Sequence, residues 1–173
     1  MKKLCAPLVT VLLTGQAFAQ NPGVVSRSAP LIGANGETIG QVIVRGSASS
    51  TIARIIVAPG GLTPGWHGVH FHAVGDCSDL GEFRLARGPV DHLVKNHGFL
   101  NSEGPKEGDL PNIYANADGS AHAEVSSHTV RMLGQTGLIE GDGSALIIHA
   151  EEDDHTSQPV GNSGARVACA VLK

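Results

Sequence analysis

The sequence predicts an all-β domain, an antiparallel sandwich or barrel. Short runs rich in β-branched residues recur along the chain and are separated by turns in which glycine is frequent. Glycine accounts for 23 of the 173 residues. No segment combines the 3.6-residue apolar period of an amphipathic helix with capping residues. The length fits one domain with an N-terminal extension.

Six segments have the composition or the alternation of strands. In chain order they are residues 38–46, 51–58, 66–73, the hairpin 112–126, 144–150 and 165–172. The hairpin is expected to turn on Asp118-Gly119, a common pair of turn residues. Two connections, residues 74–111 and 151–164, are too long for plain turns, and loops of that length usually carry function.

The N-terminus reads as a secretory signal peptide over residues 1–19. Lys2 and Lys3 precede a short apolar stretch, and Ala17-Phe18-Ala19 has the small-x-small pattern of a cleavage site. We therefore expect residues 20–37 to be a linker, residues 38–173 to be the folded domain, and the mature protein to be periplasmic or secreted. The formal net charge of −4 disfavours nucleic-acid binding, and no apolar run is long enough for a membrane span.

Export would leave two cysteines, Cys77 and Cys169, in an oxidising compartment. There, a bridge between them is favoured over two unrelated buried thiols. It would close a long loop and remove denatured-state entropy worth roughly 4 kcal/mol in the chain-entropy model.

The chain contains nine histidines, and three of them fall where a metal ion could use them. His70 and His72 alternate on one expected strand, so their side chains leave the same face. His149 closes another expected strand and could provide a third nitrogen. Sites made only of imidazole suit copper or zinc. The alternative is that these histidines are packed or solvated without a metal.

Several motifs resemble, in order, those of the copper/zinc superoxide dismutases of the bacterial secreted type. They are Gly68-Val69-His70-Phe71-His72, Gly108-Asp109-Leu110-Pro111, His149 with Asp153-Asp154, and Gly161-Asn162-Ser163-Gly164-Ala165-Arg166-Val167-Ala168-Cys169. The resemblance runs from about residue 38 to the C-terminus. It implies an eight-stranded Greek-key β-barrel related to the immunoglobulin sandwich, with two long functional loops and a Cys77–Cys169 disulfide.

The resemblance also implies roles for individual residues. His70, His72 and His149 match three of the family's four copper ligands, and His67 matches a packed histidine near the copper. Arg166 matches the arginine that attracts superoxide. Asp153 matches the carboxylate that links the copper-side and zinc-side histidines.

The zinc half departs from the family pattern. Pro89 stands where the family has the histidine that bridges the two metals, and Lys106 stands where it has another zinc histidine. His97 and Asp109 alone remain as a remnant of the zinc site, and a structural zinc normally has four protein ligands. Copper alone is the expected cofactor. Two substitutes for the lost ligands are conceivable, a re-routed His92 or a Lys106 ammonium beside Asp109; the alternative, which we favour, is that both residues lie on the loop surface.

The function implied is an exported copper-dependent superoxide dismutase, which turns two superoxide anions and two protons into O₂ and H₂O₂. Pro89 is expected to reduce the activity or shift its pH dependence. Superoxide and an unidentified copper donor are the expected partners, and the protein is expected to be a monomer or a homodimer. Two alternatives are a non-catalytic periplasmic copper carrier on the same fold and a metal-free sandwich held by the disulfide.

Overall fold

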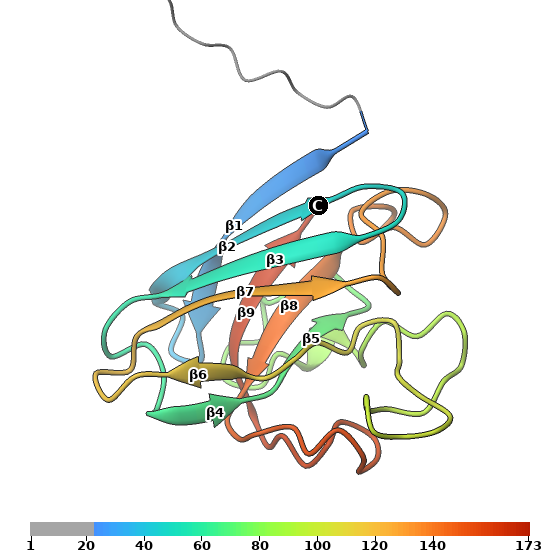
Figure 1. Ribbon diagram of the computed structural model, residues 1–173. Helices are drawn as coiled ribbons and strands as arrows, with labels where there is room; N and C mark the ends of the chain where they lie inside the picture. The colour runs from blue at the N-terminus through green and yellow to red at the C-terminus, as the bar shows by residue number, and fades with distance from the viewer. Residues whose placement is uncertain (1–22) are drawn as a thin grey trace, which may run out of the picture.

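The computed structural model describes residues 23–173, so the predicted signal peptide lies outside the described residues. Nine strands and one short 3₁₀ turn make up the regular structure of this range (Figure 1). In chain order they are β1 Val25–Gly33, β2 Thr38–Gly46, β3 Thr51–Val57, β4 Gly65–His67, β5 Val69–His72, the turn η1 Arg84–Ala86, β6 Ile113–Ala115, β7 Ala121–Ser127, β8 Ser144–His149 and β9 Arg166–Leu172. No helix in residues 23–173 is long and apolar enough to cross a membrane.

All strand pairs are antiparallel. Seven strands form a curled sheet in the order β5-β8-β9-β1-β2-β3-β7, and β4 pairs with β6 in a second, two-stranded sheet. The two sheets are joined at both ends, because β4 leads into β5 through Gly68 and β6 leads into β7 through the Asp118-Gly119 turn. The predicted all-β antiparallel class is thus confirmed. The hairpin prediction was wrong in one respect, since β6 and β7 take different partners, β4 and β3.

The strand predicted at 66–73 is broken at Gly68, which raises the count from the expected eight strands to nine. The Gly68 amide donates to the Glu151 carbonyl at 2.8 Å, and the Gly68 carbonyl accepts from the His149 amide at 2.9 Å. A Cβ at this position would lie 2.8 Å from the Cβ of Ser163 and 3.2 Å from that of Asp153. Glycine therefore lets the loop 151–164 pack directly across the strand.

The predicted linker over 20–37 is a second correction, because Val25–Gly33 form strand β1. Ala29, Leu31 and Gly33 are buried in alternation, and β1 pairs with β2 along its length and with β9 at its end. The first half of β1 is polar and exposed, and Pro30 interrupts its sequence pattern. Local composition therefore predicts a linker, whereas pairing with β2 makes these residues part of the domain.

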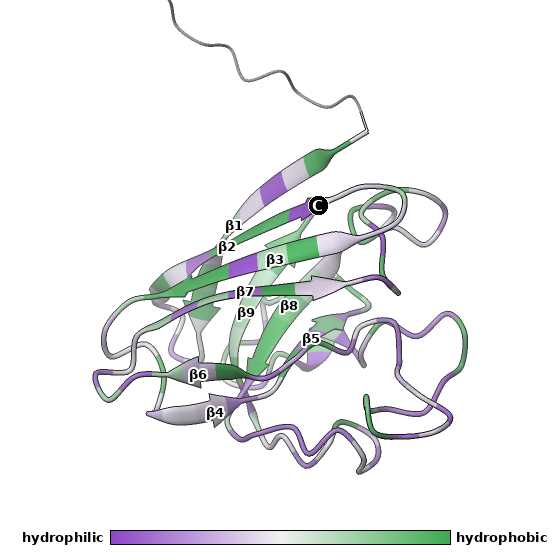
Figure 2. Ribbon diagram, viewed as in Figure 1, coloured by the Kyte–Doolittle hydropathy of each residue, from purple (hydrophilic) through white to green (hydrophobic). Residues whose placement is uncertain are grey.

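Apolar side chains fill the interior of the curled sheet. The green of hydrophobic residues is most frequent along β2, β3, β8 and β9 (Figure 2). Strand β8 is buried on both sides. Leu146 and Ile148 face the main core, whereas Ala145 and Ile147 face a smaller cluster with Phe83 and Ala86 of the η1 region. Burial on both faces explains why β8 is continuously apolar, and it fixes the end of the strand that carries His149.

The predicted disulfide between Cys77 and Cys169 is present, and it lies beside this smaller cluster. It joins the loop 74–111 to β9, three residues after Arg166. The bridge therefore ties the irregular loop to a buried strand.

Reduction of this disulfide is expected to lower the free energy of unfolding by about 2–4 kcal/mol, because the denatured chain regains the freedom of a long loop. The measurement is denaturant unfolding of the metal-free mature chain with and without reductant. The double variant Cys77→Ser/Cys169→Ser is the control and should not respond to reductant. An equal stability of the reduced and oxidised protein would contradict the expectation.

Candidate metal centre

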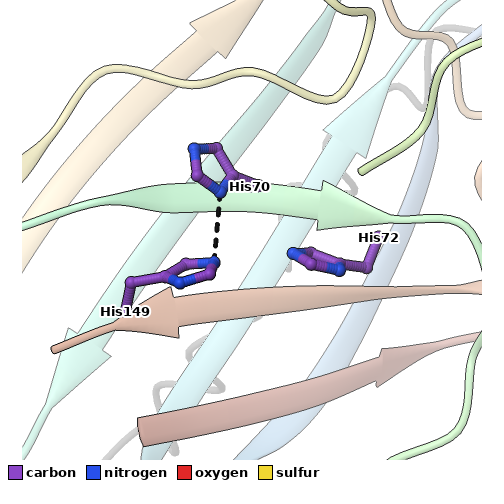
Figure 3. Close-up of side chains that lie close together, drawn as sticks. All are labelled: His70, His72 and His149. Carbon is purple, nitrogen blue, oxygen red and sulfur yellow. Dashed lines mark hydrogen bonds between the residues drawn. The ribbon is translucent and has the colours of Figure 1, made fainter. Parts of the chain in front are cut away.

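Three buried histidine rings converge beside the β5–β8 pair (Figure 3). His70 and His72 leave β5 on the same side, as their spacing predicts, and His149 comes from the last position of β8. One ring nitrogen of each histidine lies within 4.8 Å of a ring nitrogen of both others. The closest pair is His70 Nδ1 and His149 Nε2, at 3.1 Å.

Each ring has its other nitrogen occupied by an oxygen that can only accept a hydrogen bond. The three contacts are His70 Nε2 to Asp153 Oδ2 at 2.7 Å, His72 Nδ1 to the Arg87 carbonyl at 2.7 Å, and His149 Nδ1 to the Gly164 carbonyl at 3.3 Å. The protons of the three neutral rings therefore sit on these outer nitrogens, and the lone pairs of the other nitrogens face one another. Metal-ligating histidines are commonly fixed in this way.

His72 Nε2 is fully buried and has no hydrogen-bond partner within residues 23–173. Burial lowers the pKa of His72 well below its usual value, against the opposing effect of the Arg87 carbonyl. Burial and then the neighbouring His70 lower the pKa of His149 to about 3. Neutral imidazoles with inward lone pairs and one unpartnered nitrogen fit a copper ion.

Asp153 connects this trio to the loop 74–111. One of its carboxylate oxygens accepts from His70 Nε2 at 2.7 Å, and the other accepts from His97 Nε2 at 2.9 Å and from the His155 amide at 2.7 Å. Burial alone would raise the pKa of Asp153, but the bonds from His70 and His97 lower it far below the usual range. The side chain is therefore an ionised, buried carboxylate between two histidines.

His97 and Asp109, the remnant of the expected zinc site, contact each other directly. His97 Nδ1 lies 2.9 Å from Asp109 Oδ1, and Asp109 Oδ2 accepts from the amides of Gly98 at 2.8 Å and Lys106 at 3.0 Å. Burial alone would lower the pKa of His97, but Asp109 and Asp153 together raise it to about 9. Every polar side-chain atom of His97 and Asp109 has a partner, in contrast to His72.

Neither conceivable substitute for the lost zinc ligands reaches this pair. Lys106 contacts Asp109 through its backbone amide, and its ammonium makes no ion pair in residues 23–173. His92 instead lies 3.3 Å from Glu107 and is about half exposed. The backbone of Pro89 pairs with that of His72 in an isolated antiparallel β-bridge. Pro89 therefore lies beside the trio, but its side chain has no ligand atom. His97 and Asp109 thus offer two of the four protein ligands of a structural zinc site. A second group of possible ligands, His70, His97 and Asp153, has its ligand atoms within 4.8 Å of one another.

Arg166 lies at the side of the histidine trio. It is half-buried, and its Nη1 donates to the Phe83 carbonyl at 2.5 Å. It is paired with His149 across the β8–β9 ladder, and its positive charge contributes to the lowered pKa values of His72 and His149. Together with Arg84 and Gly164 it lines an open depression of about 430 Å³. A small anion could enter this depression.

Two positioning residues were missed in the sequence analysis. Gly161 has a φ of +62°, and a Cβ there would overlap Asp153 Oδ1 and lie 2.8 Å from His97 Nε2. Asn112 holds the backbone of Asp153 on both sides, since its amide group donates to the Asp153 carbonyl at 2.8 Å and accepts from the Asp153 amide at 3.0 Å. Gly161 stands in a motif used for the resemblance, whereas nothing in the sequence around Asn112 signals its contact.

Comparison with known proteins agrees with this geometry. A family model described as copper/zinc superoxide dismutase matches residues 38–172. A copper–zinc superoxide dismutase of Caulobacter vibrioides is 41% identical over 152 residues, or 86% of each chain. The crystal structure of a superoxide dismutase-like protein from Bacillus subtilis superposes with a TM-score of 0.78 at 31% identity, covering 84% of this chain and 97% of that one.

A copper/zinc superoxide dismutase from Brucella abortus gives a TM-score of 0.70 at 26% identity and covers 86% of this chain and 100% of its own. The family model spans most of the chain, and the Caulobacter relative is similar over nearly its whole length. This chain therefore belongs to the copper/zinc superoxide dismutase family.

Gly161→Ala is expected to destabilise the fold by about 1–3 kcal/mol more than Gly141→Ala, because the added methyl group would overlap the Asp153 carboxylate. Gly141 is the matched control, since its φ is +56° and a Cβ there would meet nothing within 4 Å. Both variants then carry the same backbone strain, and only one disturbs Asp153. Denaturant unfolding measures the difference, and equal losses would show that Gly161 is not packed against Asp153.

The stability of the metal-free protein is expected to fall as the pH rises from about 6.5 to 9. The pKa of His97 is raised on folding to about 9, so its stabilising contribution is complete below pH 6.5 and is lost as His97 deprotonates in the native state. A shift of this size corresponds to a contribution on the order of 3 kcal/mol. Unfolding curves at several pH values measure it; His97→Gln should remove this slope, and the same slope in both proteins would contradict the assignment.

Proposed function

We propose that this protein is an exported superoxide dismutase that uses copper and works without the family's zinc ion. The observation that carries the proposal is the histidine trio, in which the outer nitrogens are occupied and His72 Nε2 is buried without a partner in the described part of the chain. Family membership supports the reaction, since the Caulobacter relative is named a superoxide dismutase. The predicted signal peptide and the disulfide support export.

Copper, when bound by His70, His72 and His149, would supply the one-electron chemistry that converts two superoxide anions and two protons into O₂ and H₂O₂. The protein's own contribution is to hold three rings in one tautomer and orientation. Asp153, the Arg87 carbonyl and the Gly164 carbonyl do this from the outer side of each ring. The rings therefore need little rearrangement on binding the metal.

Arg166 supplies positive charge next to the trio, at the side of the open depression. Its bond to the Phe83 carbonyl keeps the guanidinium in place, and a guanidinium has further N–H groups that can donate to an anion. This charge would attract superoxide and orient it toward the rings.

Pro89 changes which group can supply the protons that the reaction consumes. The family's bridging histidine would accept and return a proton at this position, but proline has no titratable atom. Protons would therefore come from solvent, which predicts a slower reaction or a shifted pH dependence compared with relatives that keep the bridge.

A copper carrier without turnover is the second candidate, because Pro89 removes the bridging imidazole and leaves the copper trio intact. The Bacillus relative is itself named only superoxide dismutase-like. This candidate predicts tight copper binding with no catalysed loss of superoxide.

The rate of superoxide decay separates the two candidates. The mature chain, residues 20–173, loaded with one equivalent of copper, is expected to catalyse the decay. Arg166→Ala should lower the second-order rate constant on the order of tenfold or more, and His149→Ala should lose copper as well. Arg54→Ala is the control, because Arg54 is an exposed arginine paired with Glu124 on the β3–β7 edge. A decay rate no higher than that of copper-free buffer, with copper still bound, would establish the carrier.

A further inference from the structure

We propose that the direct contact between His97 and Asp109 takes the place of the zinc ion in this chain, and that it orients the copper ligand His70 through Asp153. This inference rests on the copper-only function proposed above, and it assigns His97 as a positioning residue. His97 touches neither the copper-facing nitrogens nor the depression beside Arg166.

The side-chain atoms of His97 and Asp109 that could bind a metal ion already take part in hydrogen bonds. The side chains of His97 and Asp109 are both fully buried. His97 uses both ring nitrogens, one on each carboxylate, and Asp109 receives three N–H groups, from the His97 ring and from the amides of Gly98 and Lys106. A zinc ion between His97 and Asp109 would have to displace these donors and would gain only two protein ligands. The neighbouring group His70, His97 and Asp153 offers three, still one fewer than a structural zinc uses.

The backbone of His97 is also held without a metal. The Gln158 side chain accepts from the His97 amide at 2.9 Å and donates to the His97 carbonyl at 2.9 Å. Gly98 follows with a φ of +109°, and a Cβ there would overlap the His155 carbonyl. The loops 74–111 and 151–164 therefore meet at His97 in close backbone contact.

From this point a continuous series of buried contacts runs to the copper trio. Asp109 to His97 measures 2.9 Å, His97 to Asp153 2.9 Å, and Asp153 to His70 2.7 Å. All four side chains are shielded from solvent. Because Asp153 accepts from both rings, the position of His97 restricts the carboxylate that in turn holds the His70 ring.

His92 provides a matched control on the same loop. It also contacts a carboxylate, Glu107, but at 3.3 Å and with its side chain 45% exposed, and it is not connected to Asp153. His97→Gln and His92→Gln thus make the same chemical change at a buried, connected position and at an exposed, unconnected one.

The first test adds zinc to the mature chain already loaded with one equivalent of copper, because the free histidine trio could itself bind zinc, and follows thermal unfolding and heats of binding. No zinc-dependent rise in the melting temperature is expected. The double variant Pro89→His/Lys106→His, which supplies the two missing family histidines, should gain such a rise. A tight one-equivalent zinc site in the unaltered chain that His97→Gln abolishes would overturn the proposal. No superoxide is involved, so this outcome is independent of the dismutase assignment.

The second test reads the effect of His97 on the copper site without measuring turnover. In His97→Gln the affinity for copper should fall about tenfold, and the electron paramagnetic resonance spectrum of bound Cu(II) should change. His92→Gln should leave both unchanged. Should His97→Gln fail to fold, Asp109→Asn, which keeps the shape but weakens the acceptor, takes its place with the same expectation in smaller degree. An unchanged affinity and spectrum in the folded variants would contradict the positioning role.

Discussion

The Asp153 carboxylate is the constraint on which the rest of the site depends. An ionised carboxylate buried in a protein is costly unless its oxygens are fully hydrogen-bonded. Here it accepts from His70, His97 and the His155 amide, and Asn112 fixes its backbone. The requirement extends outward: Gly161 must lack a Cβ to leave room for the carboxylate, and Gly68 must lack one so that the loop bearing Asp153 can pack across the broken strand.

The strands carry the three candidate copper ligands, and the two long loops carry the groups that contact those ligands. His70, His72 and His149 stand on strands buried on both sides, whereas Asp153, His97, Asp109 and the carbonyls of Arg87 and Gly164 belong to irregular segments. Those segments have little regular hydrogen bonding of their own. They are held by the Cys77–Cys169 disulfide, by the Gln158 contacts to His97 and by Asp153 itself. In this account the loops are ordered by covalent and polar links where other members of the family would add zinc.

Much of the fold could be predicted from the sequence, because it depends on local pattern. The β-branched runs in 38–46 and 51–58 placed β2 and β3 closely, and the H-x-H spacing placed His70 and His72 on one side of β5. What failed depends on contacts between distant segments. β1 is polar in its first half and is made a strand by pairing with β2. The two arms of the predicted hairpin pair with different strands, β6 with β4 and β7 with β3. The sequence left the Lys106 ammonium open as a substitute for zinc but favoured a position on the loop surface, and in the structure Lys106 contacts Asp109 through its backbone amide.

The central claim is that the protein holds copper on three histidines and closes the zinc position with its own side chains. Crystals grown from the mature chain with both copper and zinc present, and measured at the absorption edges of each metal, test it most directly. The account predicts a copper anomalous peak among His70, His72 and His149, no zinc peak near His97, and a retained hydrogen bond between His97 and Asp109. A zinc peak between His97 and Asp109, with those two side chains coordinating it, would contradict the account.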